Sequence, residues 1–206
     1  MSMNRAEAEE ALTLIRRVVN RVHDETVVQN WGAVMVTVGS MDLVAFGITQ
    51  FLATSAVHRV APYLITWAIY LTVGLVVNLR VRTRMGGSMS YVERHIWGNG
   101  LTYYSACIAI VAIDCWSLEP ARALTLIPAH AAIIGAISFS FMALIDTRFF
   151  MCTAVHLAVG VTVSFWSDYG FAVLGLAWFL CLVVPGLHYV RERRRLMTGG
   201  EQAEIV

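Results

Sequence analysis

Residues 31–53 read WGAVMVTVGSMDLVAFGITQFLA, an apolar stretch in which Asp42 is the only charged residue. A helix rises about 1.5 Å per residue, so this stretch is long enough to cross the roughly 30 Å of hydrocarbon in a bilayer. Similar apolar stretches follow, separated by short polar segments, at residues 61–78, 96–116, 123–145, 149–166 and 170–190. The sequence therefore predicts an all-α polytopic membrane protein whose core is a bundle of six transmembrane helices.

The composition of the whole chain agrees with this class. Of its 206 residues, 58% are apolar and 14% are charged, whereas soluble domains have roughly 45–50% and about 25%. All 15 basic residues are arginine, which excludes a retinal Schiff base, a lysine nucleophile and the phosphate-binding lysine of a P-loop. The four cysteines fall inside apolar stretches without metal-ligand spacing, so we expect no disulfide, no metal site and no cofactor.

The arginines predict how the chain is oriented in the membrane. If the six stretches are spans, only Arg59 and Arg122 lie on one side and the other 13 of the 15 arginines lie on the opposite side. Because cytoplasmic loops are enriched in arginine, both termini are predicted to be cytoplasmic. The N-terminus is acidic where a secretory signal needs a basic start, so no cleaved signal peptide is expected. We expect the chain to be integral to a bacterial inner membrane.

These patterns divide the chain into three regions. Residues 1–28 are predicted to form an amphipathic cytoplasmic helix, residues 29–190 the bundle, and residues 191–206 a basic and then flexible cytoplasmic tail. Apolar residues recur in the first region at the three- and four-residue spacings of one helix face, at Ala8, Leu12, Ile15, Val19 and Val22. This helix either docks a cytosolic partner or a second copy, or lies on the bilayer surface.

The connections between the spans are too short to hold a soluble catalytic domain. The longest runs only from residue 79 to residue 95 and is basic, so any chemistry must occur inside the bundle, at its interfaces or on a partner chain. The expected partners are the bilayer and a cytosolic protein or a second copy, and not nucleic acid. The predicted docking surface combines the first helix with the basic loop, through Leu12, Ile15, Val19, Val22, Arg82 and Arg84.

Asp42 is the most informative single residue. It lies near the predicted bilayer midplane, where a carboxylate costs on the order of 3 kcal/mol. Its helix face also carries small or polar residues that let another helix or a solute approach closely, namely Gly39, Ala45 and Thr49. Asp42 is therefore either a proton- or cation-binding carboxylate or a buried structural hydrogen-bonding group. His156 is expected to hydrogen-bond to it, and Thr49 and Tyr103 complete the predicted ion or solute site.

Three functions from different classes remain open at this point. The first is a non-catalytic membrane subunit that docks a cytosolic or membrane partner through its cytoplasmic face. The second is a small transporter, or a proton- or cation-linked translocation unit, centred on Asp42. The third is a redox subunit with a b-type haem between His130 and His156, although the predicted depths of the two rings differ by about 10 Å.

Overall fold

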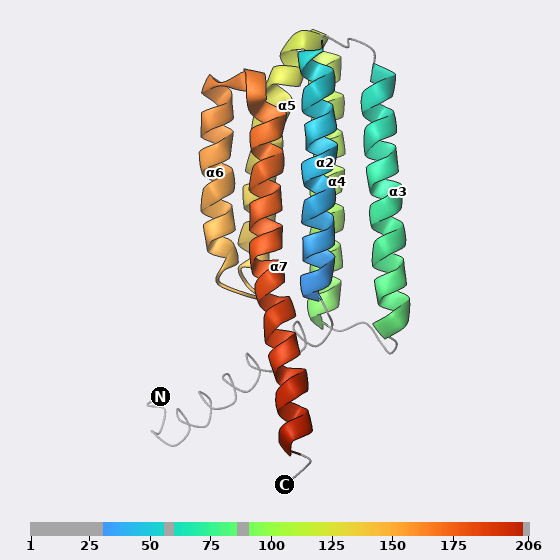
Figure 1. Cartoon of the computed structure of the whole chain (residues 1–206). Coiled ribbons are helices and arrows are strands. Elements are labelled where there is room, and N and C mark those ends of the chain that lie inside the picture. The colour runs from blue at the N-terminus through green and yellow to red at the C-terminus, as the bar shows by residue number, and fades with distance from the viewer. Residues whose placement is uncertain (1–30, 56–59, 86–90, 204–206) are drawn as a thin grey trace, which may run out of the picture.

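The computed structural model describes residues 31–55, 60–85 and 91–203, and nearly all of these residues are helical. In chain order the elements are α2 (Trp31–Thr54), α3 (Val60–Met85), α4 (Tyr91–Ser117), α5 (Pro120–Met142), α6 (Phe149–Phe165), the short 3-10 helix η1 (Ser167–Tyr169) and α7 (Gly170–Ala203). Figure 1 shows the helices side by side with nearly parallel long axes. The predicted all-α class is therefore confirmed.

The described helices have the length and composition of membrane spans. Five of those in the described residues are long and apolar enough to cross a bilayer, namely α2, α3, α4, α5 and α7. Helix α6 is equally apolar but has 17 residues, at the lower end of the lengths that span a bilayer. Several apolar helices of this kind support a membrane location for the chain.

The predicted docking residues fall largely outside what the structure describes. Leu12, Ile15, Val19 and Val22, with the rest of the predicted amphipathic helix, precede the first described residue. Arg82 and Arg84 lie in the last turns of α3, but only their backbone is described. Their part in docking stays a prediction.

Helices α2 and α7 form the closest contact in the bundle. A Cβ atom added to Gly32 would lie 2.6 Å from the carbonyl oxygen of Gly186, and one added to Gly186 would lie 2.9 Å from the carbonyl oxygen of Gly32. Further along the same pair, a Cβ at Gly175 would lie 2.6 Å from the Cβ of Phe46. Glycine is needed at these positions because the two backbones touch there, as in many close-packed transmembrane pairs.

The rest of the core lies where α5 and α6 pack together and meet α7. Small alanines of α5 face large side chains of the neighbouring helices, and Phe139 stacks on Phe149 with ring centroids 5.9 Å apart. Leu174 and Val163 are fully buried in the same region. Small residues on one helix thus make room for large residues on the next, which is how interiors reach close packing.

Helices α3 and α4 sit differently from the other four. In the most apolar 18-residue segment of each helix, 6% of the residues of α3 and 0% of those of α4 are buried. The corresponding share is 44% in α2 and in α5, and 56% in α7. Figure 1 shows α3 at the edge of the bundle. The large apolar side chains exposed on these two helices are mainly Leu, Ile and Val, which are the side chains that lipid chains contact in a membrane.

Helix α7 extends beyond the other described helices. It has 34 residues, which corresponds to about 51 Å of helix. Figure 1 shows its C-terminal part projecting past the ends of the others, at the end of the bundle where α5 connects to α6. The sequence predicted a tail from residue 191, and the structure continues the helix to Ala203.

Candidate functional site

Asp42 lies inside the bundle and faces α3. Only 5% of the residue is exposed, although it stands in the middle of an otherwise apolar helix. Its carboxyl group lies close enough to the hydroxyl of Tyr70 for the two to interact, and the Tyr70 oxygen lies 2.7 Å from the Tyr104 oxygen on α4. All three groups are satisfied if Tyr104 donates to Tyr70 and Tyr70 donates to Asp42. We call these three residues the Asp42 network.

The Asp42 network joins three helices. The carboxyl group comes from α2, and the two phenols come from α3 and α4. Hydrogen bonds to a buried carboxyl group offset part of the cost of removing it from water. The arrangement can hold a proton at the carboxyl group, and it also fastens α3 to its neighbours.

Tyr103 and Thr49, two other residues of the predicted solute site, differ in whether they lie next to the Asp42 network. Tyr103 packs against the edge of the network, with its ring centroid 5.3 Å from Tyr104 and 4.7 Å from Trp178 of α7. Thr49 is buried, but its hydroxyl donates to the carbonyl oxygen of Ala45 on its own helix at 2.8 Å. Tyr103 is therefore next to the Asp42 network, whereas the Thr49 hydroxyl is occupied by the α2 backbone.

The predicted hydrogen bond between His156 and Asp42 is wrong. His156 is fully buried, and its Nδ1 lies 3.0 Å from the Cys152 carbonyl oxygen on the same helix. Its ring packs against Trp178 at 4.9 Å and occupies the space left by Gly135, where a Cβ atom would lie 2.6 Å from the imidazole. Depth along the membrane normal was a poor guide, because the ring faces α5 and α7 while Asp42 faces α3.

His156 nevertheless keeps one polar atom without a partner. Among the described residues, no donor or acceptor lies within hydrogen-bonding distance of its Nε2, and the same holds for the indole nitrogen of Trp178. Both atoms lie in a close-packed part of the core. The close contact at Gly135 leaves this packing little space to adjust, so we regard His156 as a core residue.

His130 makes a separate polar contact between α4 and α5. Its Nδ1 lies 2.9 Å from the carboxylate of Asp114, whose side chain is 8% exposed. Towards the other end of the same helix pair, Asn99 donates to the Ser138 hydroxyl at 2.8 Å. The contacts of His130 and His156 give the two imidazoles no common site, so the geometry does not favour the haem alternative.

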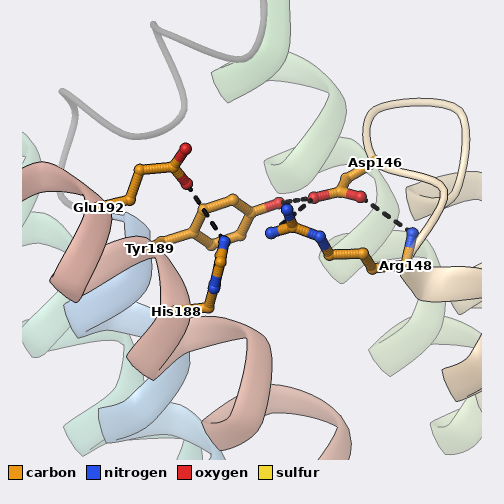
Figure 2. Close-up of polar contacts among 5 residues, drawn as sticks. All are labelled: Asp146, Arg148, His188, Tyr189 and Glu192. Carbon is orange, nitrogen blue, oxygen red and sulfur yellow. Dashed lines mark hydrogen bonds and ion pairs between the residues drawn. The ribbon is translucent and has the colours of Figure 1, made fainter.

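A polar cluster lies at the end of the bundle from which α7 projects (Figure 2). The Tyr189 hydroxyl donates to Asp146 Oδ2 at 2.5 Å, and the backbone N–H of Arg148 donates to Asp146 Oδ1 at 2.9 Å. The Arg148 guanidinium is 3.8 Å from the same carboxylate, and His188 lies 3.4 Å from Glu192 on the next turn of α7. We call these five residues the α7 base cluster.

The α7 base cluster fixes the position of the projecting helix. Asp146 belongs to the turn between α5 and α6, whereas Tyr189 belongs to α7 and is 1% exposed. Residues 191–195 then read RERRR, which places four arginines directly beyond the cluster. A shallow hollow of about 230 Å³ lies along this part of α7, lined by His188, Arg191, Glu192 and Arg195.

No family model, curated protein or solved structure matches the chain. Any functional assignment must therefore rest on the geometry described above. In the part of the chain that the structure describes, no group of three or more His, Cys, Asp or Glu residues is placed to hold a metal ion.

Sequence reasoning missed the partners of the two best-connected carboxylates. The sequence pattern singled out neither Tyr70 nor Tyr189. A usable signal was present in both cases, since each buried carboxylate needs a donor and a tyrosine is the donor most easily carried by an apolar helix. Which tyrosine serves which carboxylate depends on helix neighbours, and a single sequence does not supply these.

Proposed function

We propose that the chain is a non-catalytic integral membrane subunit that docks a partner protein at its cytoplasmic end. In this proposal all six helices span a bacterial inner membrane, α6 included, and both termini are cytoplasmic. The distribution of the arginines supports this orientation. The short turns between the described helices support a bundle without a catalytic domain of its own.

The observation that carries the proposal is the projection of α7 (Figure 1), which carries the basic run RERRR at residues 191–195. Short helices are marginal in water when nothing packs against them. Arg191 and Arg195 are one turn apart, and like charges at this spacing destabilise a helix slightly. An acidic partner surface that packed against this projection would stabilise it, because the arginines would supply the complementary charge.

The base of the projection supports the same reading. Tyr189 and Asp146 hold α7 to the turn between α5 and α6, so the helix leaves the bundle in a defined direction. A flexible basic tail would be sufficient to orient the chain in the membrane. A fixed helical direction adds the ability to present the arginines in one geometry to a partner, which favours specificity over general attraction.

Photo-crosslinking in native membranes tests this function. A photoreactive amino acid at position 194, which is exposed on the projection, should give a protein adduct of defined mass. The matched control is position 108, where Ile108 on α4 is 62% exposed in the apolar part of the bundle and should give lipid adducts alone. The double variant Arg191→Gln with Arg195→Gln should weaken the protein adduct at 194 by more than about fivefold. Lipid adducts alone at position 194 would contradict docking.

A second candidate function is favoured by one specific observation, the Asp42 network. A midspan carboxyl group next to the Tyr70 hydroxyl, which in turn lies 2.7 Å from the Tyr104 hydroxyl, is a residue that can bind and release a proton within the bundle. In this alternative the chain is a small proton- or cation-linked translocation unit with Asp42 as its exchange site. Tyr70 would orient the carboxyl group, and Tyr103 would line its inner side.

Proton flux into proteoliposomes distinguishes the second candidate from the first. Wild type should acidify the lumen under an imposed membrane potential, and Asp42→Asn should reduce the rate to that of empty liposomes, because an amide does not titrate. Asp114→Asn is the matched control, since Asp114 is similarly buried, at 6% exposure, but pairs with His130. Equal rates for wild type, Asp42→Asn and empty liposomes would leave Asp42 a structural residue.

A further inference from the structure

A hollow of about 410 Å³ opens at the turn between α6 and α7, at the end of the bundle opposite the arginines of α7. Figure 1 shows this turn at the top of the bundle, where α6 passes through η1 into α7. The hollow is lined mainly by residues of the turn itself, with Phe165, Trp166, Asp168 and Tyr169 among them.

Aromatic rings dominate the lining and are open to the surroundings. Phe165 is 80% exposed, Trp166 is 73% exposed and Tyr169 is 67% exposed. All three lie within five consecutive residues, and Asp168 places a carboxylate among them. The faces of aromatic rings attract cations, with tryptophan the strongest, and a carboxylate adds a full negative charge.

The turn is held in place by contacts on both sides. The Gln50 side chain on α2 donates from Nε2 to the backbone carbonyl of Asp168 at 2.7 Å, and its Oε1 accepts from the backbone N–H of Ala172 at 3.1 Å. Gly170 sits so close to α5 that an added Cβ would lie 3.0 Å from Pro128. These contacts hold the backbone of the turn in place, which lowers the entropic cost of ordering it around a ligand.

The composition of the lining selects the chemistry of the ligand. A small, strongly hydrated metal cation prefers several oxygen ligands, whereas this lining offers a single carboxylate. A quaternary ammonium group carries its charge on methyl groups that pack against aromatic rings. We propose that this hollow binds a quaternary ammonium group, presented either by a free small molecule such as choline or by the headgroup of phosphatidylcholine.

Equilibrium dialysis with radiolabelled choline tests the site on the full chain in dodecyl maltoside. Wild type should bind choline saturably. Trp166→Leu should weaken binding about fivefold, and Asp168→Asn should weaken it about threefold. Trp166→Phe keeps a ring at the same place and should retain most of the affinity, which separates loss of the aromatic face from misfolding.

Two controls decide whether the binding is of the proposed kind. The neutral isostere 3,3-dimethylbutan-1-ol has the shape of choline without the charge and should not compete. Trp116→Leu removes the 92% exposed tryptophan at the end of α4, which lies at the same end of the bundle but outside the hollow, and should leave binding unchanged. Competition by the isostere, or a loss of choline binding in Trp116→Leu equal to that in Trp166→Leu, would overturn the proposal. Either result would mean that the rings at the hollow act only as interfacial aromatic residues.

A lipid arm distinguishes the two sources of the ligand. The protein is reconstituted in mixed nanodiscs of phosphatidylcholine and phosphatidylglycerol, and the lipids that remain after extraction are quantified for wild type and Asp168→Asn. Enrichment of phosphatidylcholine in wild type alone supports the headgroup as ligand, and choline binding without enrichment supports a free solute. The absence of both choline binding and enrichment overturns the proposal.

Discussion

Helix α2 makes two contacts of opposite character. Toward α7 it presents Gly32 and Gly39, and the backbones of the two helices approach until an added Cβ would collide. Toward α3 it presents Phe46, whose ring centroid lies 5.0 Å from that of Trp67, and Asp42, whose carboxyl group lies next to the hydroxyl of Tyr70. The first contact buries backbone, and the second is built from rings and one carboxyl group.

The difference shows what holds helices together when the solvent is lipid. Leucine, isoleucine and valine gain little by leaving lipid for another helix, so close packing of small residues and interhelical hydrogen bonds decide which helices associate. Helix α7 therefore buries 56% of its most apolar window, while α3 buries 6% and carries many exposed apolar side chains. We expect α3 to be the more weakly held of the two.

The largest effect should come from adding a single methyl group between α2 and α7. In Gly32→Ala the new Cβ would lie 2.6 Å from a backbone carbonyl oxygen and 2.8 Å from a backbone nitrogen. Because neither atom can move cheaply, we expect a loss of about 1–3 kcal/mol in the free energy of unfolding, measured as a lower midpoint of thermal unfolding in detergent.

The control for this change lies on the same helix. Gly47 has no atom within 4 Å of an added Cβ, so Gly47→Ala should leave the midpoint unchanged or raise it slightly, because alanine favours a helix. Equal destabilisation by both substitutions would show that helix flexibility matters here and that the α2–α7 contact does not.

A smaller effect should follow from cutting the polar tie at the base of α7. Tyr189→Phe removes the hydroxyl that donates to Asp146, whose side chain is 10% exposed, and among the described residues leaves this carboxylate the contacts with Arg148. The expected loss is about 1–2 kcal/mol, measured in the same unfolding assay. Tyr169→Phe removes an exposed hydroxyl and should have no effect; an equal effect of the two changes would mean that the Tyr189 tie contributes nothing.

The contact between α2 and α3, the weaker of the two, predicts an effect confined to α3. Tyr70→Phe removes the hydroxyl shared by Asp42 and Tyr104, and we expect a loss of about 1 kcal/mol. Because this network holds α3, hydrogen exchange should become faster in α3 than in α7. Uniform acceleration across both helices would contradict the idea that α3 opens separately from the rest of the bundle.

The positions of the helices could be predicted from the sequence, but the contacts between them could not. The predicted stretch 31–53 corresponds to α2 at Trp31–Thr54, and 149–166 corresponds to α6 at Phe149–Phe165. Apolar length alone sets these bounds, because polar residues interrupt each stretch at the membrane surface.

Partners require knowledge of which helices are neighbours. The burial of Asp42 was expected, but its partner was assigned by depth to His156, whereas the structure gives Tyr70. Depth fixes the position of a residue along the membrane normal. Two residues at equal depth can still face different neighbouring helices. The glycines of α2 and α7 were equally visible in the sequence, yet only the structure shows that Gly32 faces Gly186.

The smallest effect is expected on the outer face of α3. Leu64 is 64% exposed there, and in a membrane this side chain contacts lipid in the folded state and also when the helices separate. Leu64→Ala should therefore change the unfolding free energy by no more than about 0.5 kcal/mol, although Leu→Ala in a soluble core costs about 2–5 kcal/mol. Leu174 of α7 is fully buried and supplies the matched comparison, since Leu174→Ala should destabilise strongly in the same assay. A large loss in Leu64→Ala would mean that α3 is covered by another protein surface in the intact molecule, and the contrast between its two faces would no longer hold.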